Sequence, residues 1–139
     1  MKDLFNLLKI LYCIKFYAKD IHYSAFGDNF WSDHEFADRI YDNLDNYIDD
    51  INENLYLGFE EDAPKSKDVL EAVIKSLPSV DEDMEKNWES LYAFLVIALE
   101  NIKTIGDEYD LPQLNSLLDD LANDLQKKKG LVWRRIGGV

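Results

Sequence analysis

The segment from Ser32 to Leu57 repeats apolar residues at steps of three and four, a spacing that a long α-helix places on one face. The apolar positions are Phe36, Ile40, Leu44, Tyr47, Ile51 and Leu55. Ser32 and Glu35 have the spacing of a capping box at the start, and Gly58 suits the position just after the end. The pattern therefore predicts a helix over residues 32–57 that buries one face.

Three further segments have the same periodicity and predict helices over residues 3–24, 80–105 and 111–129. A second capping box, Ser79 to Glu82, precedes the middle one, and Gly106 and Gly130 are expected to end the last two. Residues 59–78 form a crossover with a short helix before Pro78. Two helix pairs joined by one long connection predict an all-α four-helix bundle, with residues 1–139 as a single domain.

Composition limits the classes of function. Hydrophobic residues make up 47% of the chain and charged residues 31%, as in globular domains. The net charge of −13 argues against a nucleic-acid-binding surface and suits metal cations or a highly soluble assembly. Cys13, the only cysteine, is expected to be a buried packing residue. Because there is no signal-peptide pattern and no apolar stretch of membrane-spanning length, a soluble, cytoplasmic protein is expected.

A polar stripe lies on the segment that Ser32 begins, at about 160° from its apolar stripe. Its members are His34, Asp38, Asp42, Asp45, Asp49 and Glu53. Imidazole and carboxylate together form a ligand set typical of iron, and five neighbouring acids repel one another unless a cation lies among them. The stripe therefore predicts metal ligands that point away from the bundle core.

Helix geometry limits what one chain binds there. His34 and Asp38 are one turn apart, as are Asp49 and Glu53, whereas Asp38 and Asp49 are separated by a rise of about 16 Å. Two half-sites are therefore expected, which a second copy packed antiparallel across a two-fold axis would complete. The chain has no Glu-x-x-His motif, so a di-iron centre inside the bundle is not expected.

The residues around the half-sites also follow a known order. They are, along the chain, His22, Tyr23, Gly27, Phe30, Trp31, Ser32, Asp33, His34, Glu35, Asp38, Asp49, Glu53, Leu57 and Gly58. This order resembles the Dps family, the miniferritins that protect DNA in starved cells. The family pattern is His-Trp, a Gly-containing loop, aromatic-x-x-His-Glu-x-x-x-Asp, Asp-x-x-x-Glu and Leu-Gly. The last segment, with Leu117, Asp119, Leu121 and Trp133, is also similar to the last helix of that family.

The resemblance implies a ferritin-like bundle that assembles into a hollow dodecamer. It implies sites at two-fold interfaces that oxidise Fe(II), typically with hydrogen peroxide, and a store of ferric mineral inside the cage. By motif matching, one subunit would supply His22, His34 and Asp38 to each iron site, and its two-fold mate would supply Asp49 and Glu53.

Two departures from the family are visible: Tyr23 replaces the usual Trp, and Asp33 adds an acid beside His34. Some members carry a lysine-rich DNA-binding extension, which is not expected here because Lys2 is the only lysine before the first helix. The C-terminal basic cluster is Lys127, Lys128, Lys129, Arg134 and Arg135. Because cations at a helix C-terminus commonly serve the helix dipole, DNA binding is expected to be weak or absent.

Several assignments have a structural alternative. Trp31 and Tyr41 are candidate electron donors near the site, but packing aromatics are favoured. Asp119, Asp120 and Asp124 would line a cation pore at a three-fold axis, and an ordinary exposed helix face is slightly favoured. For the whole protein, the alternative is a degenerate ferritin-like bundle with a structural or interaction role, in which the polar stripe is only an assembly interface.

Overall fold

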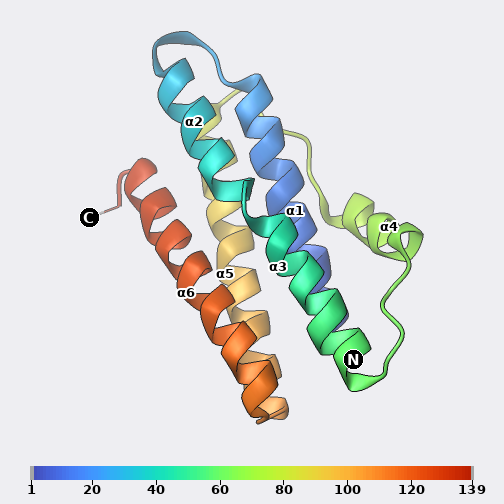
Figure 1. Ribbon diagram of the computed structural model, residues 1–139. Helices are drawn as coiled ribbons and strands as arrows, with labels where there is room; N and C mark the ends of the chain where they lie inside the picture. The colour runs from blue at the N-terminus through green and yellow to red at the C-terminus, as the bar shows by residue number, and fades with distance from the viewer. Residues whose placement is uncertain (1, 139) are drawn as a thin grey trace.

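The computed structural model describes residues 2–138, which form helices and connecting segments without any β-strand (Figure 1). The elements are α1 (Lys2–Ser24), the 3-10 helix η1 (Gly27–Asn29), α2 (Phe30–Tyr41), α3 (Leu44–Asp50), the π-helix η2 (Ile51–Tyr56), the 3-10 helix η3 (Leu57–Phe59), α4 (Ser66–Ser76), α5 (Met84–Glu108) and α6 (Pro112–Arg135). The predicted all-α class is confirmed. Within residues 2–138, no helix has the length and apolar character needed to cross a membrane.

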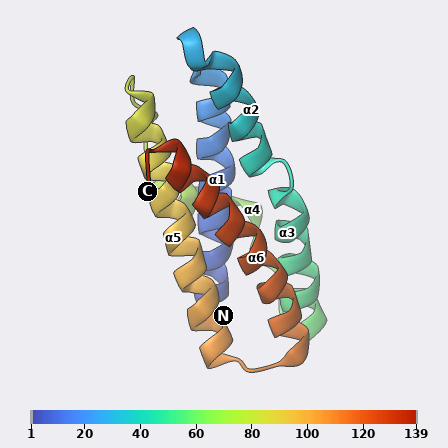
Figure 2. The same ribbon diagram turned by 90° about the vertical axis from the view of Figure 1, so that its left-hand side faces the viewer.

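The long helices lie side by side (Figures 1 and 2). α1 packs against both α2 and α5, and α5 packs against α6. α3 and η2 continue in the direction of α2, and the chain then crosses over through α4, which packs against α1. The start of α1, η3 and the α5–α6 turn meet at one end of the molecule, while the α1–α2 connection lies at the other.

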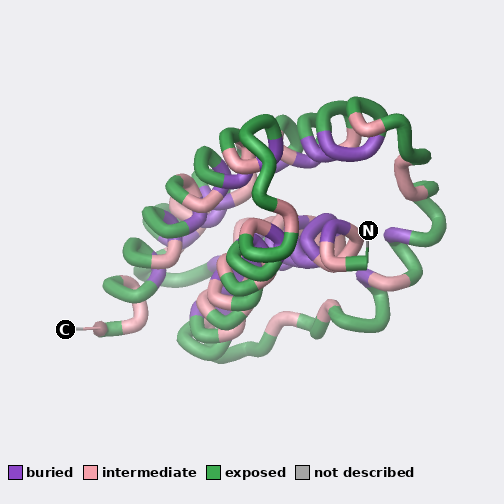
Figure 3. The backbone as a smooth tube through the Cα atoms, turned by 90° about the horizontal axis from the view of Figure 1, so that it is seen from below, coloured by how far each residue is buried: buried purple, intermediate pink, exposed green. Residues whose placement is uncertain are grey.

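The core consists of the inward faces of these helices, as the view from below shows (Figure 3). Its fully buried side chains include Leu7, Leu11, Ile14, Ile21, Ile40, Leu44, Ile51, Leu55, Trp88, Leu91, Leu95, Leu121 and Leu125. The apolar stripe predicted for residues 32–57 is confirmed at its centre, although Ile48 is buried where Tyr47 was expected. Cys13 is buried as predicted, and this burial raises the pKa of its thiol.

Both predicted capping boxes are wrong. α2 begins at Phe30, before Ser32, whose hydroxyl donates to the backbone carbonyl of Asn29 at 3.1 Å. α5 begins at Met84, and its cap is Asp83, which accepts from the backbone N–H of Glu85 at 3.0 Å.

The start of α5 is delayed by a buried asparagine. Asn87 Oδ1 accepts from the backbone N–H of Asp81 at 2.7 Å, and Asn87 Nδ2 donates to the Asp81 carbonyl at 2.9 Å. Tyr17 Oη also donates to Asn87 Oδ1, at 3.0 Å. These bonds occupy backbone groups of Asp81 and hold the segment before Met84 outside the helix.

The helix predicted over residues 32–57 is interrupted at Asp42 and Asn43, between α2 and α3. α6 supplies side chains that stabilise the interruption: Asn43 Nδ2 donates to Asp124 Oδ1 at 3.1 Å, and Lys128 donates to Asn43 Oδ1. Lys128 is buried and forms an ion pair with Asp124 at 2.8 Å. Burial lowers the pKa of Lys128, and the Asp124 carboxylate opposes that shift.

Three glycines predicted to end helices do not end them. After η3 the left-handed residue is Glu60, with φ of 61°, rather than Gly58. The Glu61 N–H donates to the Tyr56 carbonyl at 2.9 Å and the Glu60 N–H to the Leu57 carbonyl at 3.0 Å, which is a Schellman motif. Gly106 and Gly130 lie inside α5 and α6. A glycine costs a helix about 1 kcal/mol, and burial of Val132 outweighs this cost in α6.

Tyr56 gives the fold a pH dependence. Burial raises its pKa from 10.0 to about 12. Tyrosine in the unfolded chain ionises near pH 10, so the unfolded state loses its proton first as the pH rises from 10 to 12. We expect this residue to lower the free energy of unfolding by about 1.4 kcal/mol per pH unit over that range. In chemical denaturation, the free energy of unfolding of Tyr56→Phe should fall less steeply between pH 10 and pH 12 than that of the wild type. The matched control is Tyr23→Phe, which removes an exposed phenol; equal slopes for Tyr56→Phe and the wild type would contradict the assignment.

Candidate metal centre

The two histidines meet at the α1–α2 connection, where the last turn of α1 faces the first turns of α2. Their rings are stacked, with centroids 3.5 Å apart and an interplanar angle of 16°. His22 Nδ1 lies 2.7 Å from the His34 carbonyl oxygen, and His34 Nδ1 lies 2.6 Å from the His22 carbonyl oxygen. Each histidine therefore binds the backbone of the other.

This reciprocal pairing fixes the tautomer of both rings. A carbonyl oxygen only accepts hydrogen bonds, so each Nδ1 carries the proton and donates. In the neutral imidazole the lone pair is then on Nε2. Neither Nε2 makes a hydrogen bond within residues 2–138. Both rings are half-buried and present this nitrogen as a preorganised ligand atom.

Tyr41 lies beside the histidine pair. The Tyr41 ring is edge-on to His22, with centroids 5.7 Å apart. Burial first, and then the neighbouring Asp38 carboxylate, raise the pKa of Tyr41 to about 12. Tyr41 thus lies between the Asp38 carboxylate, three residues earlier on α2, and the His22 ring.

Asp49 and Glu53 lie further along, on α3 and η2. Both are exposed, as is Asp38, so the expectation that the carboxylates of the stripe point away from the core is confirmed. Glu53 lies within the π-helical turn Ile51–Tyr56, a distortion that is frequent at functional sites. Within residues 2–138, no three His, Cys, Asp or Glu side chains lie close enough to hold one metal ion.

The other stripe acids have different roles. Asp45 forms an ion pair with Lys15 of α1 at 2.7 Å, and Asp42 is exposed beside the helix interruption. Of the proposed pore acids, Asp119 and Asp120 are exposed, whereas Asp124 is taken up by Lys128 and Asn43. The exposed-face reading therefore holds for two of these three acids but not for Asp124.

Two exposed aromatic side chains, Tyr23 and Trp31, contact the histidine pair. Trp31 is 68% exposed and edge-on to His34, with centroids 6.1 Å apart. Tyr23 and Phe26 are also largely exposed. The packing role favoured for Trp31 is wrong, because most of its ring is outside the core. Tyr41 is half-buried, as that role requires.

Sequence reasoning missed a buried ionic contact. Asp33, read as an extra acid beside His34, is 4% exposed and binds Arg135 of α6 through two bonds, of 2.8 and 3.1 Å. Arg135 also binds Glu85 and lies over the Trp88 ring, at 5.8 Å from its centroid. The hydrogen bonds to Asp33 raise the pKa of Arg135.

Helical phase could have revealed this contact. Asp33 is in register with the buried residues Ala37, Ile40 and Leu44, and Arg135 with Leu125, Lys128 and Val132. A charged residue in phase with each apolar stripe indicates a buried pair. Two members of the predicted basic cluster, Lys128 and Arg135, are therefore turned inward, and Lys127 and Arg134 remain exposed.

No protein-family model matches the chain, and no significant match was found among curated proteins.

Proposed function

We propose that this chain is a ferritin-like four-helix bundle with one long crossover that oxidises Fe(II) at sites shared between two subunits. The proposed assembly is a homo-oligomeric cage of the Dps type, a dodecamer, that stores the ferric product. Hydrogen peroxide is the proposed oxidant. The proposal includes no DNA-binding role, since the net charge is −13 and two residues of the C-terminal basic cluster, Lys128 and Arg135, are paired with Asp124 and Asp33.

The histidine pair carries the proposal. The reciprocal Nδ1 bonds between His22 and His34 leave two imidazole Nε2 atoms as ligands at one place on the surface. Asp38 follows His34 by one turn of α2 and is exposed. Two imidazoles and a carboxylate form a ligand set that suits Fe(II). In the single chain these three side chains are not gathered closely enough to hold one ion, so the proposed site would form on assembly.

The second half of each site would come from a partner. Asp49 and Glu53 are exposed on the same outward side of the α2–α3–η2 run, too far along it to share an ion with His34. An antiparallel two-fold contact between copies of this run would place them beside the histidines and create two equal sites. Bound iron would also reduce the repulsion between the facing acids.

In the proposed reaction iron is the substrate. Two Fe(II) ions each lose one electron, and one hydrogen peroxide molecule takes up both. Its O–O bond breaks, and with two protons it forms two molecules of water. The imidazoles and carboxylates hold the ions and keep positions open for the oxidant. Fe(III) then hydrolyses to mineral inside the cage.

The function is tested by anaerobic titration with Fe(II), followed by hydrogen peroxide. We expect saturable Fe(II) binding and, on adding peroxide, a rise in ferric absorbance that ends at two Fe(II) per peroxide. Native mass spectrometry with and without Fe(II) reports the assembly in the same samples. Absence of saturable binding and of ferric absorbance would refute the iron-oxidising function and leave a bundle with a structural or interaction role.

A further inference from the structure

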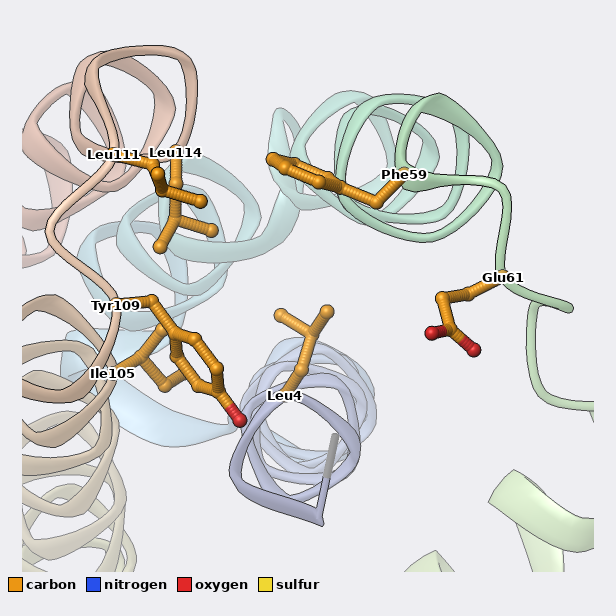
Figure 4. A pocket seen from close by; sticks show the side chains of 7 residues that line it. All are labelled: Leu4, Phe59, Glu61, Ile105, Tyr109, Leu111 and Leu114. Carbon is orange, nitrogen blue, oxygen red and sulfur yellow. The ribbon is translucent and has the colours of Figure 1, made fainter.

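A cavity of about 200 Å³ opens at the end of the molecule opposite the histidine pair. Its walls come from the start of α1, from η3 and the residues that follow it, and from the α5–α6 turn. Figure 4 shows Phe59 and Glu61 on one side of it, Tyr109 and Leu114 on the other, and Leu4 between them. Segments far apart in the sequence thus form one hollow.

Most of the wall is apolar. Leu4, Ile105 and Leu114 belong to the hydrophobic core and are each no more than 3% exposed, so the cavity is a recess of the core. Apolar cavities of roughly 150 Å³ bind benzene. This one therefore has room for an aromatic ring with a short chain attached.

Glu61 is the one charged residue that lines the cavity within residues 2–138. Its carboxylate forms no ion pair within that part of the chain. Phe59 and Tyr109 add two aromatic faces, which attract cations.

We propose that this cavity binds a small organic cation, an ammonium group on an apolar body about the size of one aromatic ring. The apolar body fills the recess beside Leu4, Ile105 and Leu114. The ammonium group lies beside the Glu61 carboxylate. The negative charge of the whole chain raises the local concentration of such ligands. This site is independent of the proposed iron chemistry.

Three probes of one shape test the proposal by equilibrium dialysis against the full-length protein: 2-phenylethylammonium, neutral 2-phenylethanol and anionic 3-phenylpropionate. We expect one site per chain for the cation, with a dissociation constant of about 1 mM or tighter. The neutral probe should bind about fivefold more weakly and the anion more weakly still. No saturable binding of the cation, or equal binding of all three probes, would overturn the proposal.

Two variants locate the binding. Glu61→Gln should bring the affinities of cation and neutral probe within about twofold of each other, because only the charge is removed. Leu111→Trp, at a half-exposed wall position, should reduce the binding of every probe by filling the cavity from its rim. Asp62→Asn removes a neighbouring exposed charge outside the wall and should change nothing. Wild-type binding in either of the first two variants would place the probes elsewhere and overturn the proposal.

Discussion

Replacing Asp49 with Asn is expected to lower the initial rate of peroxide-dependent Fe(II) oxidation by at least about 100-fold, since loss of groups that merely support metal ligands costs 10–100-fold. The reason is that Asp49 is proposed to be one of the two carboxylates, with Glu53, that the partner subunit contributes to each shared site. Because its side chain is exposed and off the core face, the melting temperature should stay within about 2 °C of the wild type. Stopped-flow absorbance of the ferric product gives the rate.

Asp50→Asn is the matched control, because Asp50 is the next residue of α3 and is equally exposed. It lies about 100° around the helix from Asp49 and outside the stripe. Its oxidation rate should equal that of the wild type. Equal losses in both variants would point to the general charge of α3 rather than to a ligand, and no loss in either would remove Asp49 from the site.

Replacing Arg135 with Ala is expected to cost about 3 kcal/mol of unfolding free energy, the largest loss of stability among the substitutions considered. The change leaves the Asp33 carboxylate, whose side chain is 5% exposed, without its cation. It also removes the contacts of Arg135 with Glu85 and with the Trp88 ring, so α6 loses its polar attachment to α2 and α5. Thermal unfolding should show a decrease of about 10 °C in the melting temperature.

The control for that loss is Arg134→Ala, because Arg134 is exposed. Its contacts within residues 2–138 are local: a hydrogen bond to the Gly138 carbonyl at 3.3 Å and the neighbouring Trp133 ring, at 5.7 Å from its centroid. Its melting temperature should lie within about 2 °C of the wild type. A double variant, Arg135→Met with Asp33→Leu, replaces both charges by apolar groups and should recover much of the stability. A double variant as unstable as Arg135→Ala would show that the cost does not come from the unpaired carboxylate.

The helices could be predicted from the sequence because their apolar periodicity is long and the burial it directs dominates the energetics. Several helix ends could not, because they depend on particular side-chain contacts. Asn87 holds Asp81 outside α5, and α6 continues past Gly130, where Val132 is buried and Arg135 binds Asp33 of α2. The interruption between α2 and α3 likewise depends on Asn43 meeting α6. Propensities of about 1 kcal/mol are overridden by such contacts.

For the candidate site, the sequence predicted that His34 and Asp38 lie too far from Asp49 and Glu53 to share a metal ion. This prediction needs only the helical rise of 1.5 Å per residue, which does not depend on how the helices pack. The tautomers of His22 and His34 were not predictable. They follow from the crossing of α1 and α2, which brings each ring to the carbonyl of the other residue. The Asp33–Arg135 pair depends on packing in the same way, although helical phase carried a signal for it.

Subunit mixing tests most directly whether each site is shared between chains. The variants Asp38→Asn and Asp49→Asn are each expected to be inactive alone. In the experiment, equal amounts of the two variants are mixed, unfolded and refolded together. Half of the two-fold contacts should then join one subunit of each variant. Each such contact has two sites, and one of them combines the intact Asp38 of one subunit with the intact Asp49 of the other. The shared-site account therefore predicts about a quarter of the wild-type oxidation rate. Activity no higher than that of the separate variants, while native mass spectrometry shows mixed assemblies, would contradict it.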